Sequence, residues 1–341
     1  MRWFVISCVL AGCISDDTPR FADKGQGLWV EVPETPALEY RAVWGAHAED
    51  VFAVGDGAVH FDGRAWTIVD DVPVATYRAI WGRSKDQIWI GGDGVLLARE
   101  LTGWQPQLVF DHDQPITEFS VLAIAGDDAS EYAVLRTGGK LLLVINRGSS
   151  WETPYWRSGE ALPFAVHPSV HASRNALVLA GDGTLTDVLI STDLGVALWE
   201  TRSFAYDVAD GVSVLGGASD EYVAAGPDRV VFRFGIDDPI AVFEDRELAI
   251  ARNPHGVSMH AGHAFVVGER IEVGQAKTTS SVAASSIEAC DVDGCRLERI
   301  AGDRGAPLQA VWSDDSGHAI AVGDGWIVHR TSCGSLRCEL D

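Results

Sequence analysis

One stretch of the sequence, residues 41–66, recurs later in the chain and restricts the fold more than any other feature. Adding 37 to each number reaches Arg78-Ala-Ile-Trp-Gly82 and Gln87-Ile-Trp-Ile-Gly-Gly-Asp-Gly94, in the same order and without a gap. Adding 268 reaches Gln309-Ala-Val-Trp-Ser313 and His318-Ala-Ile-Ala-Val-Gly-Asp-Gly325. Copies of one unit at such spacings predict a repeat fold, in which neighbouring units together bury a continuous core.

Within each unit, apolar residues alternate with polar ones between Gly and Asp turns, which is typical of short antiparallel strands. The first unit predicts strands at residues 40–44, 50–54 and 58–61, and a fourth strand that begins at Trp66. Four such strands per repeat are characteristic of a propeller blade. Further units are predicted at Tyr77–Trp104, 122–151, 175–199, 214–226, 256–300 and 310–341. The expected fold is therefore an all-β, seven-bladed β-propeller of four-stranded antiparallel blades, extending over residues 28–341.

Two segments compete to complete the last blade. Leu28-Trp-Val-Glu-Val32 resembles a fourth strand, and so does Arg337-Cys-Glu-Leu-Asp341. Only one position is vacant, and the sequence leaves both possibilities open.

The fourth strand is expected to start at a large aromatic residue or at a cysteine. Trp66, Trp104, Trp151 and Trp199 occupy this position in four units, and Cys295 and Cys338 occupy it in units six and seven. Cys290 and Cys295 enclose turn residues, as do Cys333 and Cys338. Two local hairpin disulfides are favoured over a zinc site, whose paired cysteines usually lie closer together.

The N-terminus has the pattern of an export signal. Arg2 is followed by the apolar residues 3–9 and then by Leu10-Ala11-Gly12-Cys13. This tetrapeptide resembles the lipobox of bacterial lipoproteins, although an ordinary secretory signal is the alternative. The resemblance implies a signal peptide at residues 1–12, acylation of Cys13 (palmitate included), and a lipidated Cys with a polar tether at residues 13–27. Because Ile14 is not the Asp associated with inner-membrane retention, we expect anchoring in the outer membrane.

The charge balance excludes some partners. The chain of 341 residues has a formal charge of −23; removal of residues 1–12, which contain Arg2 and no acid, leaves 25 basic and 49 acidic residues and a charge of −24. Such an acidic surface argues against nucleic acid and against direct adsorption to anionic lipid. We therefore expect membrane attachment through the lipid anchor only.

The repeat also has a family resemblance. Val-Trp-Gly followed by Val-Gly-Asp-Gly is similar to the tandem repeats of predicted extracellular lipoproteins from myxobacteria, and it looks like the wider Asp-box (BNR-type) propeller group. The turn from Ser191 to Trp199 resembles an Asp box with one residue too many before its Trp. The resemblance implies a propeller in which the Asp forms a structural turn and the Trp packs between blades. It implies no activity.

Sialidases also use Asp-box propellers, so a glycan-hydrolysing or glycan-binding propeller is the alternative function. Arg41 and Arg78 lie on the first strands of their units, but Leu122 and Gln309 occupy the corresponding positions and leave no arginine triad. The set His255, His260 and His263 is expected to be divided between a strand and its turn. We therefore predict no enzyme, no cofactor and no metal site.

The acidic turns between second and third strands are the best candidate for a binding face. Asp56, Asp93, Asp182, Asp228, Glu269 and Asp324 are expected there. Loops on the same face are expected to add Asp70, Asp71, Asp111 and Asp113, with Tyr155 and Trp156. Plain turn chemistry explains Gly-Asp-Gly equally well. The predicted function is a non-catalytic, surface-anchored scaffold that binds an envelope protein or an extracellular ligand.

Overall fold

The computed structural model describes residues 28–331 except for the following positions: 112, 128–129, 149, 154–168, 174–175, 182–183, 191–198, 205–213, 219–220, 227–228, 235–241, 248–252, 261, 273–281, 292–293 and 303. Every regular element in this part is a β-strand. In the described part, no helix is long and apolar enough to cross a bilayer.

Five of the sheets contain four consecutive antiparallel strands each. The first two are β2 (Tyr40–His47), β3 (Asp50–Gly55), β4 (Ala58–Phe61), β5 (Trp66–Ile68), and β6 (Tyr77–Ser84), β7 (Gln87–Gly92), β8 (Val95–Glu100), β9 (Gly103–Pro106). The next two are β16 (Ser169–Ser173), β17 (Ala176–Gly181), β18 (Thr184–Ile190), β19 (Trp199–Phe204), and β20 (Val214–Ala218), β21 (Glu221–Ala225), β22 (Arg229–Phe234), β23 (Val242–Glu247). The fifth is β24 (Asn253–His260), β25 (His263–Glu272), β26 (Val282–Asp291), β27 (Gly294–Leu297). The all-β prediction and the strands predicted for the first unit are confirmed.

Two sheets have additional outer strands. The six-stranded sheet joins β12 (Ser120–Gly126), β13 (Glu131–Thr137), β14 (Lys140–Asn146), β15 (Ser150–Glu152), β10 (Leu108–Asp111) and β11 (Gln114–Pro115). The five-stranded sheet joins β29 (Leu308–Ser313), β30 (Ala319–Gly323), β31 (Trp326–Thr331), β1 (Leu28–Glu31) and β28 (Arg299–Ala301). Both β10 and β28 come from the preceding unit and run parallel to the outer strand of the next sheet. These linkers therefore connect successive sheets by backbone pairing.

The N-terminal strand completes the last sheet. β1 pairs antiparallel with β31, with Leu28 opposite Thr331 and Glu31 opposite Val328. Leu28–Val32 thus occupies the position for which the sequence offered two candidates, while residues 337–341 lie outside the described part of the chain. Trp29, opposite Arg330, holds the place that was assigned to Cys338 in unit seven, so that assignment is corrected.

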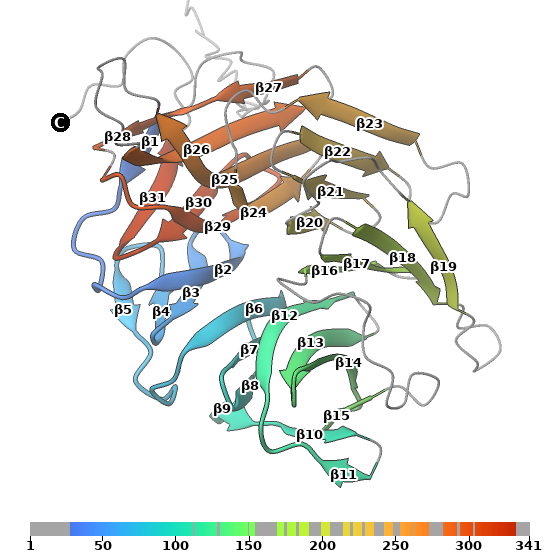
Figure 1. The fold of residues 1–341 in the computed structure, drawn as a ribbon. Coiled ribbons are helices and arrows are strands. Elements are labelled where there is room, and N and C mark those ends of the chain that lie inside the picture. The colour runs from blue at the N-terminus through green and yellow to red at the C-terminus, as the bar shows by residue number, and fades with distance from the viewer. Residues whose placement is uncertain are drawn as a thin grey trace, which may run out of the picture.

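Successive sheets pack through their first strands, as Figure 1 shows. β2 contacts β6, β6 contacts β12, and the series continues through β16, β20 and β24 to β29, which also contacts β2. Each first strand therefore lies between the first strands of two other sheets.

The Trp-Gly pair in the repeat forms one of these contacts. A Cβ placed on Gly82 would lie 2.6 Å from the Trp44 ring, and one on Gly45 would lie 2.9 Å from the Trp312 ring. Trp81 approaches Gly126 in the same way. The tryptophan of one sheet thus occupies the space left by the missing side chain in the next, which explains why the two residues recur together.

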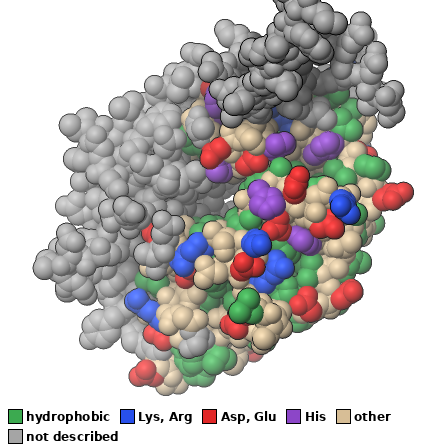
Figure 2. All heavy atoms as spheres, turned by 180° about the vertical axis from the view of Figure 1, so that it is seen from behind, with side chains coloured by type: hydrophobic (Ala, Val, Ile, Leu, Met, Phe, Trp, Pro, Cys, Tyr) green, Lys and Arg blue, Asp and Glu red, His purple; other side chains and the backbone are tan. Residues whose placement is uncertain are grey.

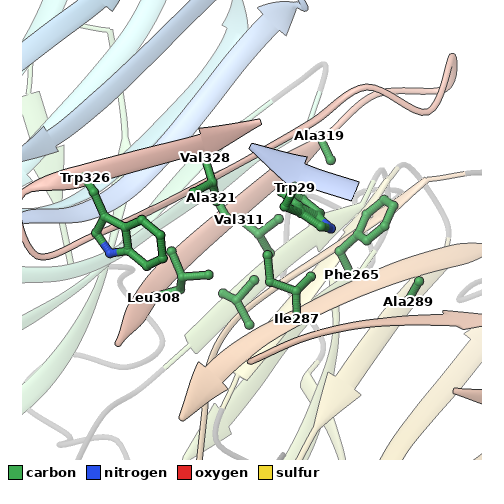
Figure 3. Packing of buried hydrophobic residues seen from close by; sticks show 11 residues of the cluster. Trp29, Phe265, Ile287, Ala289, Leu308, Val311, Ala319, Ala321, Trp326 and Val328 are labelled. Atoms are coloured by element: carbon green, nitrogen blue, oxygen red, sulfur yellow. The ribbon is translucent and has the colours of Figure 1, made fainter. Parts of the chain in front are cut away.

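The tryptophans of the outer strands belong to the cores between sheets. Trp66, Trp104 and Trp151 are at most 8% exposed, and each lies in a separate apolar cluster with residues of the preceding sheet. Trp29 occupies the same place between the fifth four-stranded sheet and the last sheet, edge-on to Phe265 and near Val311 (Figure 3). This packing is the role that the sequence resemblance implied for tryptophan.

A buried carboxylate joins the last two sheets. Glu298 lies between β27 and β28, and its side chain is fully buried. Trp29 Nε1 donates a hydrogen bond to its Oε2 at 2.8 Å, and the Arg330 guanidinium binds both oxygens at 2.9 and 2.8 Å. The Arg330 guanidinium also lies over the Phe265 ring. Because Trp29 is on β1 and Arg330 is on β31, this group fixes the N-terminal strand to the last unit.

In the fifth four-stranded sheet, Cys290 and Cys295 lie directly opposite each other across the β26–β27 hairpin and form a disulfide, with a Cα–Cα distance of 4.1 Å. Both sulfur-bearing side chains belong to the apolar cluster shared with the preceding sheet. The bond therefore occupies the place that tryptophan holds elsewhere. Cys333 and Cys338 lie outside the described residues.

Candidate functional site at the two ends of the sheets

The strand ends of the described sheets form two faces of the molecule. The Gly-Asp-Gly end carries the turns around Asp56, Asp93 and Asp324, between the second and third strands. The histidine end carries the turns between first and second strands, at residues 48–49, 85–86 and 314–317. A strand of six residues such as β31 separates the two ends by about 20 Å.

Two of the predicted acids at the Gly-Asp-Gly end are paired with arginines. Arg78 binds both carboxylate oxygens of Asp93, at 3.0 and 2.9 Å. Arg41 donates to Asp56 at 3.2 Å and to Glu39 at 2.7 Å. The hydrogen bonds from Arg78, and a smaller contribution from Ser120, hold the pKa of Asp93 below its ordinary value. The Asp93 carboxylate therefore stays ionised, and since Asp56 and Asp93 are each paired with an arginine, they do not form an unpaired ring of negative charge.

The repeat builds the same support under each arginine. The hydroxyl of Tyr77 donates to the carbonyl of Pro73 at 2.7 Å, and Tyr40 donates to Pro36. Burial raises the pKa of Tyr77 to about 12, so its hydroxyl remains a donor. The proline, tyrosine, arginine and aspartate of the first unit each recur 37 residues later in the second unit. This shared offset was the signal that would have predicted the Arg–Asp pairs.

The turn at Asp324 touches the first sheet. The backbone N–H of Gly325 donates to Leu38 O at 3.0 Å, and Glu39 forms an isolated bridge with Asp324. Likewise, Gly94 N–H donates to Phe119 O, and Asp93 bridges Ser120. Each of these turns is therefore clamped by the first strand of the following unit. Asp56, Asp93 and Asp324 do gather at one end, as predicted.

The remaining predicted acids are placed differently. Glu269 lies at the Gly-Asp-Gly end, opposite Asn253 and Ser285, but inside β25 rather than in a turn, because this hairpin extends three residues further to Glu272. Asp71 lies against the β8–β9 turn: a Cβ on Gly103 would meet its carboxylate at 2.9 Å. That turn follows β8, at the end remote from Asp93.

Asp111 and Asp113 lie in the hairpin of β10 and β11, at the outer edge of the six-stranded sheet. There the Thr153 hydroxyl donates to Asp111 at 2.7 Å. The expectation that linker acids join the turn acids is therefore wrong for Asp71, Asp111 and Asp113, because the linker lies along the outer edge of the next sheet, where β10 pairs with β15. Cys13, Asp182, Asp228, Tyr155 and Trp156 lie outside the described residues.

Histidine side chains gather at the opposite end of the molecule. His47, His60, His260, His263, His318 and His329 lie toward this end, and only His255, among the seven whose side chains are described, lies at the other. Figure 2 shows the face on which histidines gather with acidic and basic side chains. The sequence did not single out this face, although the histidines recur beside the first turn of units one, six and seven.

Three of these histidines face carboxylates. His60 Nε2 lies 2.6 Å from Asp50, and its ring stacks on Phe52. His260 Nδ1 lies 2.8 Å from Asp315 of the next sheet, and His318 Nδ1 lies 3.3 Å from Asp314. Since His255 lies at the other end, the three-histidine set of the sequence is divided. Among the residues that the structure describes, no group of three or more His, Cys, Asp or Glu side chains is arranged to hold a metal ion.

Comparisons with known proteins show the fold class of this chain. No protein-family model matches the sequence, and no curated protein matches it by sequence. Solved structures do match over nearly the whole chain, and they are β-propellers, so this chain shares the β-propeller fold.

Three of these solved structures illustrate how similar the matching propellers are to this chain. Virginiamycin B lyase from Staphylococcus aureus has a TM-score of 0.62 at 10% identity, over 89% of this chain and 97% of that one. The WD40 β-propeller domain of Doa1 has a TM-score of 0.58 at 11% identity, over 87% and 94%. YCF48 bound to D1 peptide has a TM-score of 0.57 at 13% identity, over 90% and 97%. At such identities the likeness concerns the fold alone, and it does not extend to activity.

Proposed function

We propose that this chain is a non-catalytic, seven-bladed β-propeller lipoprotein of the cell envelope, anchored through Cys13, that binds a protein partner at its Gly-Asp-Gly end. The contacts that run from β2 through the other first strands to β29, and from β29 to β2, support a closed ring of seven blades. The export signal and the lipobox-like Leu10-Ala11-Gly12-Cys13 support the anchor in the outer membrane.

One observation carries the binding proposal: charged side chains at this end are held in fixed positions while partly exposed. The side chains of Arg41, Asp56, Arg78 and Asp93 are 30–47% exposed, and each is fixed by an ion pair. Fixed groups lose little conformational entropy when a partner binds. Similar propellers support a protein or peptide ligand, since one was solved with a bound peptide.

The charge of this end favours a basic partner segment. Around the turns of Asp56, Asp93 and Asp324, the four carboxylates of Glu39, Asp56, Asp93 and Asp324 stand against the two guanidiniums of Arg41 and Arg78. Because two negative charges remain in excess, association with a basic segment is expected to weaken as salt rises.

Charge removal tests the binding end. The triple variant Asp56→Asn, Asp93→Asn, Asp324→Asn is expected to lose salt-sensitive capture of the native partner by the purified lipoprotein, followed by mass spectrometry. Its melting temperature should change little, because exposed ion pairs contribute under ~1 kcal/mol. The matched control is Glu49→Gln, Asp86→Asn, Glu100→Gln, which removes three exposed acids at the histidine end. Equal capture by both folded variants would contradict the proposed site.

The anchor is tested separately. Mass spectrometry of the mature N-terminus should find acyl chains on Cys13, and Cys13→Ser should prevent stable membrane association, since a transmembrane helix is absent from the described part. An unacylated mature N-terminus would contradict this part of the proposal.

A further inference from the structure

One unit reverses the charge at the Gly-Asp-Gly end. In five units, a register shift near the beginning of the first strand skips one residue, and this shared irregularity identifies the equivalent position on each second strand. The residues at this position are Asp56, Asp93, Arg136, Glu269 and Asp324. Unit three therefore presents a guanidinium where the other four units present a carboxylate.

Arg136 has no ion-pair partner in the described part of the chain, and its side chain is exposed. In the first two units, the residue skipped by the register shift is Arg41 or Arg78, which pairs with the aspartate. Leu122 is the skipped residue in unit three, and an apolar side chain offers a guanidinium no charge. A carboxylate from another molecule can therefore bind Arg136 without displacing an acid of this chain, as it would have to do at Arg78.

The turn beside Arg136 leaves room for a ligand and adds a second cation. Residues Thr137–Lys140 form a two-residue turn whose central glycines have φ of 54° and 79°. A Cβ on either glycine would meet no heavy atom within 4 Å, and the Lys140 side chain is exposed. Glu118 lies against this turn, because its carbonyl oxygen accepts a hydrogen bond from Thr137. Two cations against this one carboxylate give the turn a local charge of +1.

Arg136 lies near the acidic turn of the second unit. Asp93 forms a bridge with Ser120, and Ser120 pairs with Arg136 on β13. Because paired strands are about 4.8 Å apart, the backbones of Asp93 and Arg136 are separated by about 10 Å or less. An extended peptide rises about 3.3 Å per residue, so it covers this distance in about three residues.

We propose that Arg136, with Lys140 beside it, binds a carboxylate of the partner, and that this carboxylate lies about three residues from the basic group that faces Asp93. The proposal rests on the proposed function, because it adds a second determinant to the same binding end. A carboxylate suits the site because a guanidinium can bind both of its oxygens with parallel hydrogen bonds. An Asp or Glu side chain and a C-terminal carboxylate present the same oxygens. The pair of opposite charges fixes the direction in which the partner segment crosses units two and three.

Blocked peptides of about ten residues test this proposal by calorimetric titration of the full-length chain. Each contains a lysine pair and one glutamate, placed one to five residues from the nearer lysine. The spacing of three is expected to give the tightest binding, and replacing that glutamate by glutamine should weaken binding about three- to fivefold at low salt. A peptide without glutamate, whose free C-terminal carboxylate lies three residues from the lysines, distinguishes the two sources of the carboxylate.

Variants of the chain locate the effect. Arg136→Gln should abolish the preference for glutamate, and Arg136→Glu should reverse it, so that a peptide with lysine at that position binds better. The matched control is Arg64→Gln, which removes an exposed arginine at the histidine end, between β4 and β5, and should keep the preference.

The outcomes separate this proposal from the proposed function. Equal binding of the glutamate, glutamine and free-carboxylate peptides, with binding still dependent on the lysines, would overturn the carboxylate site and leave the basic-partner site intact. A preference for glutamate that survives Arg136→Gln would overturn it as well. Binding that depends on neither charge would contradict both proposals.

Discussion

At the scale of single residues, the chain depends on a few buried groups whose partners are specific. Glu298 is one, because its buried carboxylate is satisfied by Trp29 and Arg330. Arg330→Met would leave the carboxylate without its bidentate partner, with Arg296 3.9 Å away. We expect the free energy of unfolding to fall by about 3–5 kcal/mol in chemical denaturation.

The control for this prediction is Arg304→Met. Arg304 pairs with Glu31 on the same strand β1, but its side chain is 50% exposed. An exposed pair contributes at most ~1 kcal/mol. Equal losses in the two variants would show that burial of Glu298 does not matter to stability.

Gly92 is a second residue with a specific requirement. A Cβ at this position would overlap the carbonyl oxygen of Thr76, which belongs to the backbone and cannot rotate away. Gly92→Ala is expected to lower the free energy of unfolding by at least ~2 kcal/mol. Gly94→Asn is the control. The backbone at Gly94 has a φ of 72°, which Asn can adopt, and a Cβ placed there would meet no heavy atom within 4 Å. Thermal unfolding of both variants compares the two requirements. A larger loss for Gly92→Ala would show that the close approach at Gly92 needs glycine more than the turn conformation at Gly94 does.

His263 links stability to pH. Burial lowers the pKa of its imidazole from the ordinary value of 6.5, while Asp291 opposes this shift. The unfolded chain therefore binds this proton more readily, and stability decreases as pH falls through 6.5 toward the lower folded pKa. Denaturation midpoints measured across this range should fall less for His263→Gln than for the native chain. An unchanged slope would exclude His263 as a source of the pH dependence.

At the scale of strands, the outer strand is held by one large contact per sheet. Trp104 is 8% exposed and packs edge-on against Phe52 of the preceding sheet. Trp104→Ala is expected to cost about 3–5 kcal/mol through the cavity it leaves. Replacing Cys290 and Cys295 together by Ser should cost at most ~2 kcal/mol, because their bond closes a very short loop. Denaturant unfolding of the two variants measures the free energy lost in each. A larger loss for the cysteine variant would contradict the prediction that the tryptophan contact contributes more than the disulfide.

The repeat predicts the local structure well, because Gly-Asp turns and alternating apolar residues act over short distances. It also predicts the turns that carry Asp56, Asp93 and Asp324. It could not predict the contacts that occur once: Trp29 and Glu298 are 269 residues apart, and no periodicity relates them. The strand β10 escaped prediction because a linker strand depends on the edge presented by the next sheet. The His260–Asp315 contact likewise depends on how two sheets meet.

At the scale of the whole molecule, stability depends on a strand from the beginning of the sequence. β1 is flanked by β31 and β28, so Val30→Pro removes a backbone donor in a strand that is paired on both sides. We expect a lower melting temperature with earlier exchange in the peptides of β28 and β31. Val30→Thr, which keeps the donor, should leave both nearly unchanged. If hydrogen exchange became faster only in the peptide of β1, the rest of the molecule would not depend on this strand.

The contact between Trp44 and Gly82, repeated from Trp312 to Gly45 and from Trp81 to Gly126, bears on how such a chain could have grown. Units one and two contain both halves of the contact, one for each neighbour, whereas unit seven offers Trp312 but has Ser313 in place of the glycine. A duplicated unit inserted between two others would therefore find compatible surfaces on both sides without any compensating substitution. In unit three, Ala125 stands directly before Gly126, so this copy receives a tryptophan but offers none. Duplication of unit one or unit two within the chain is thus sterically permitted by this contact.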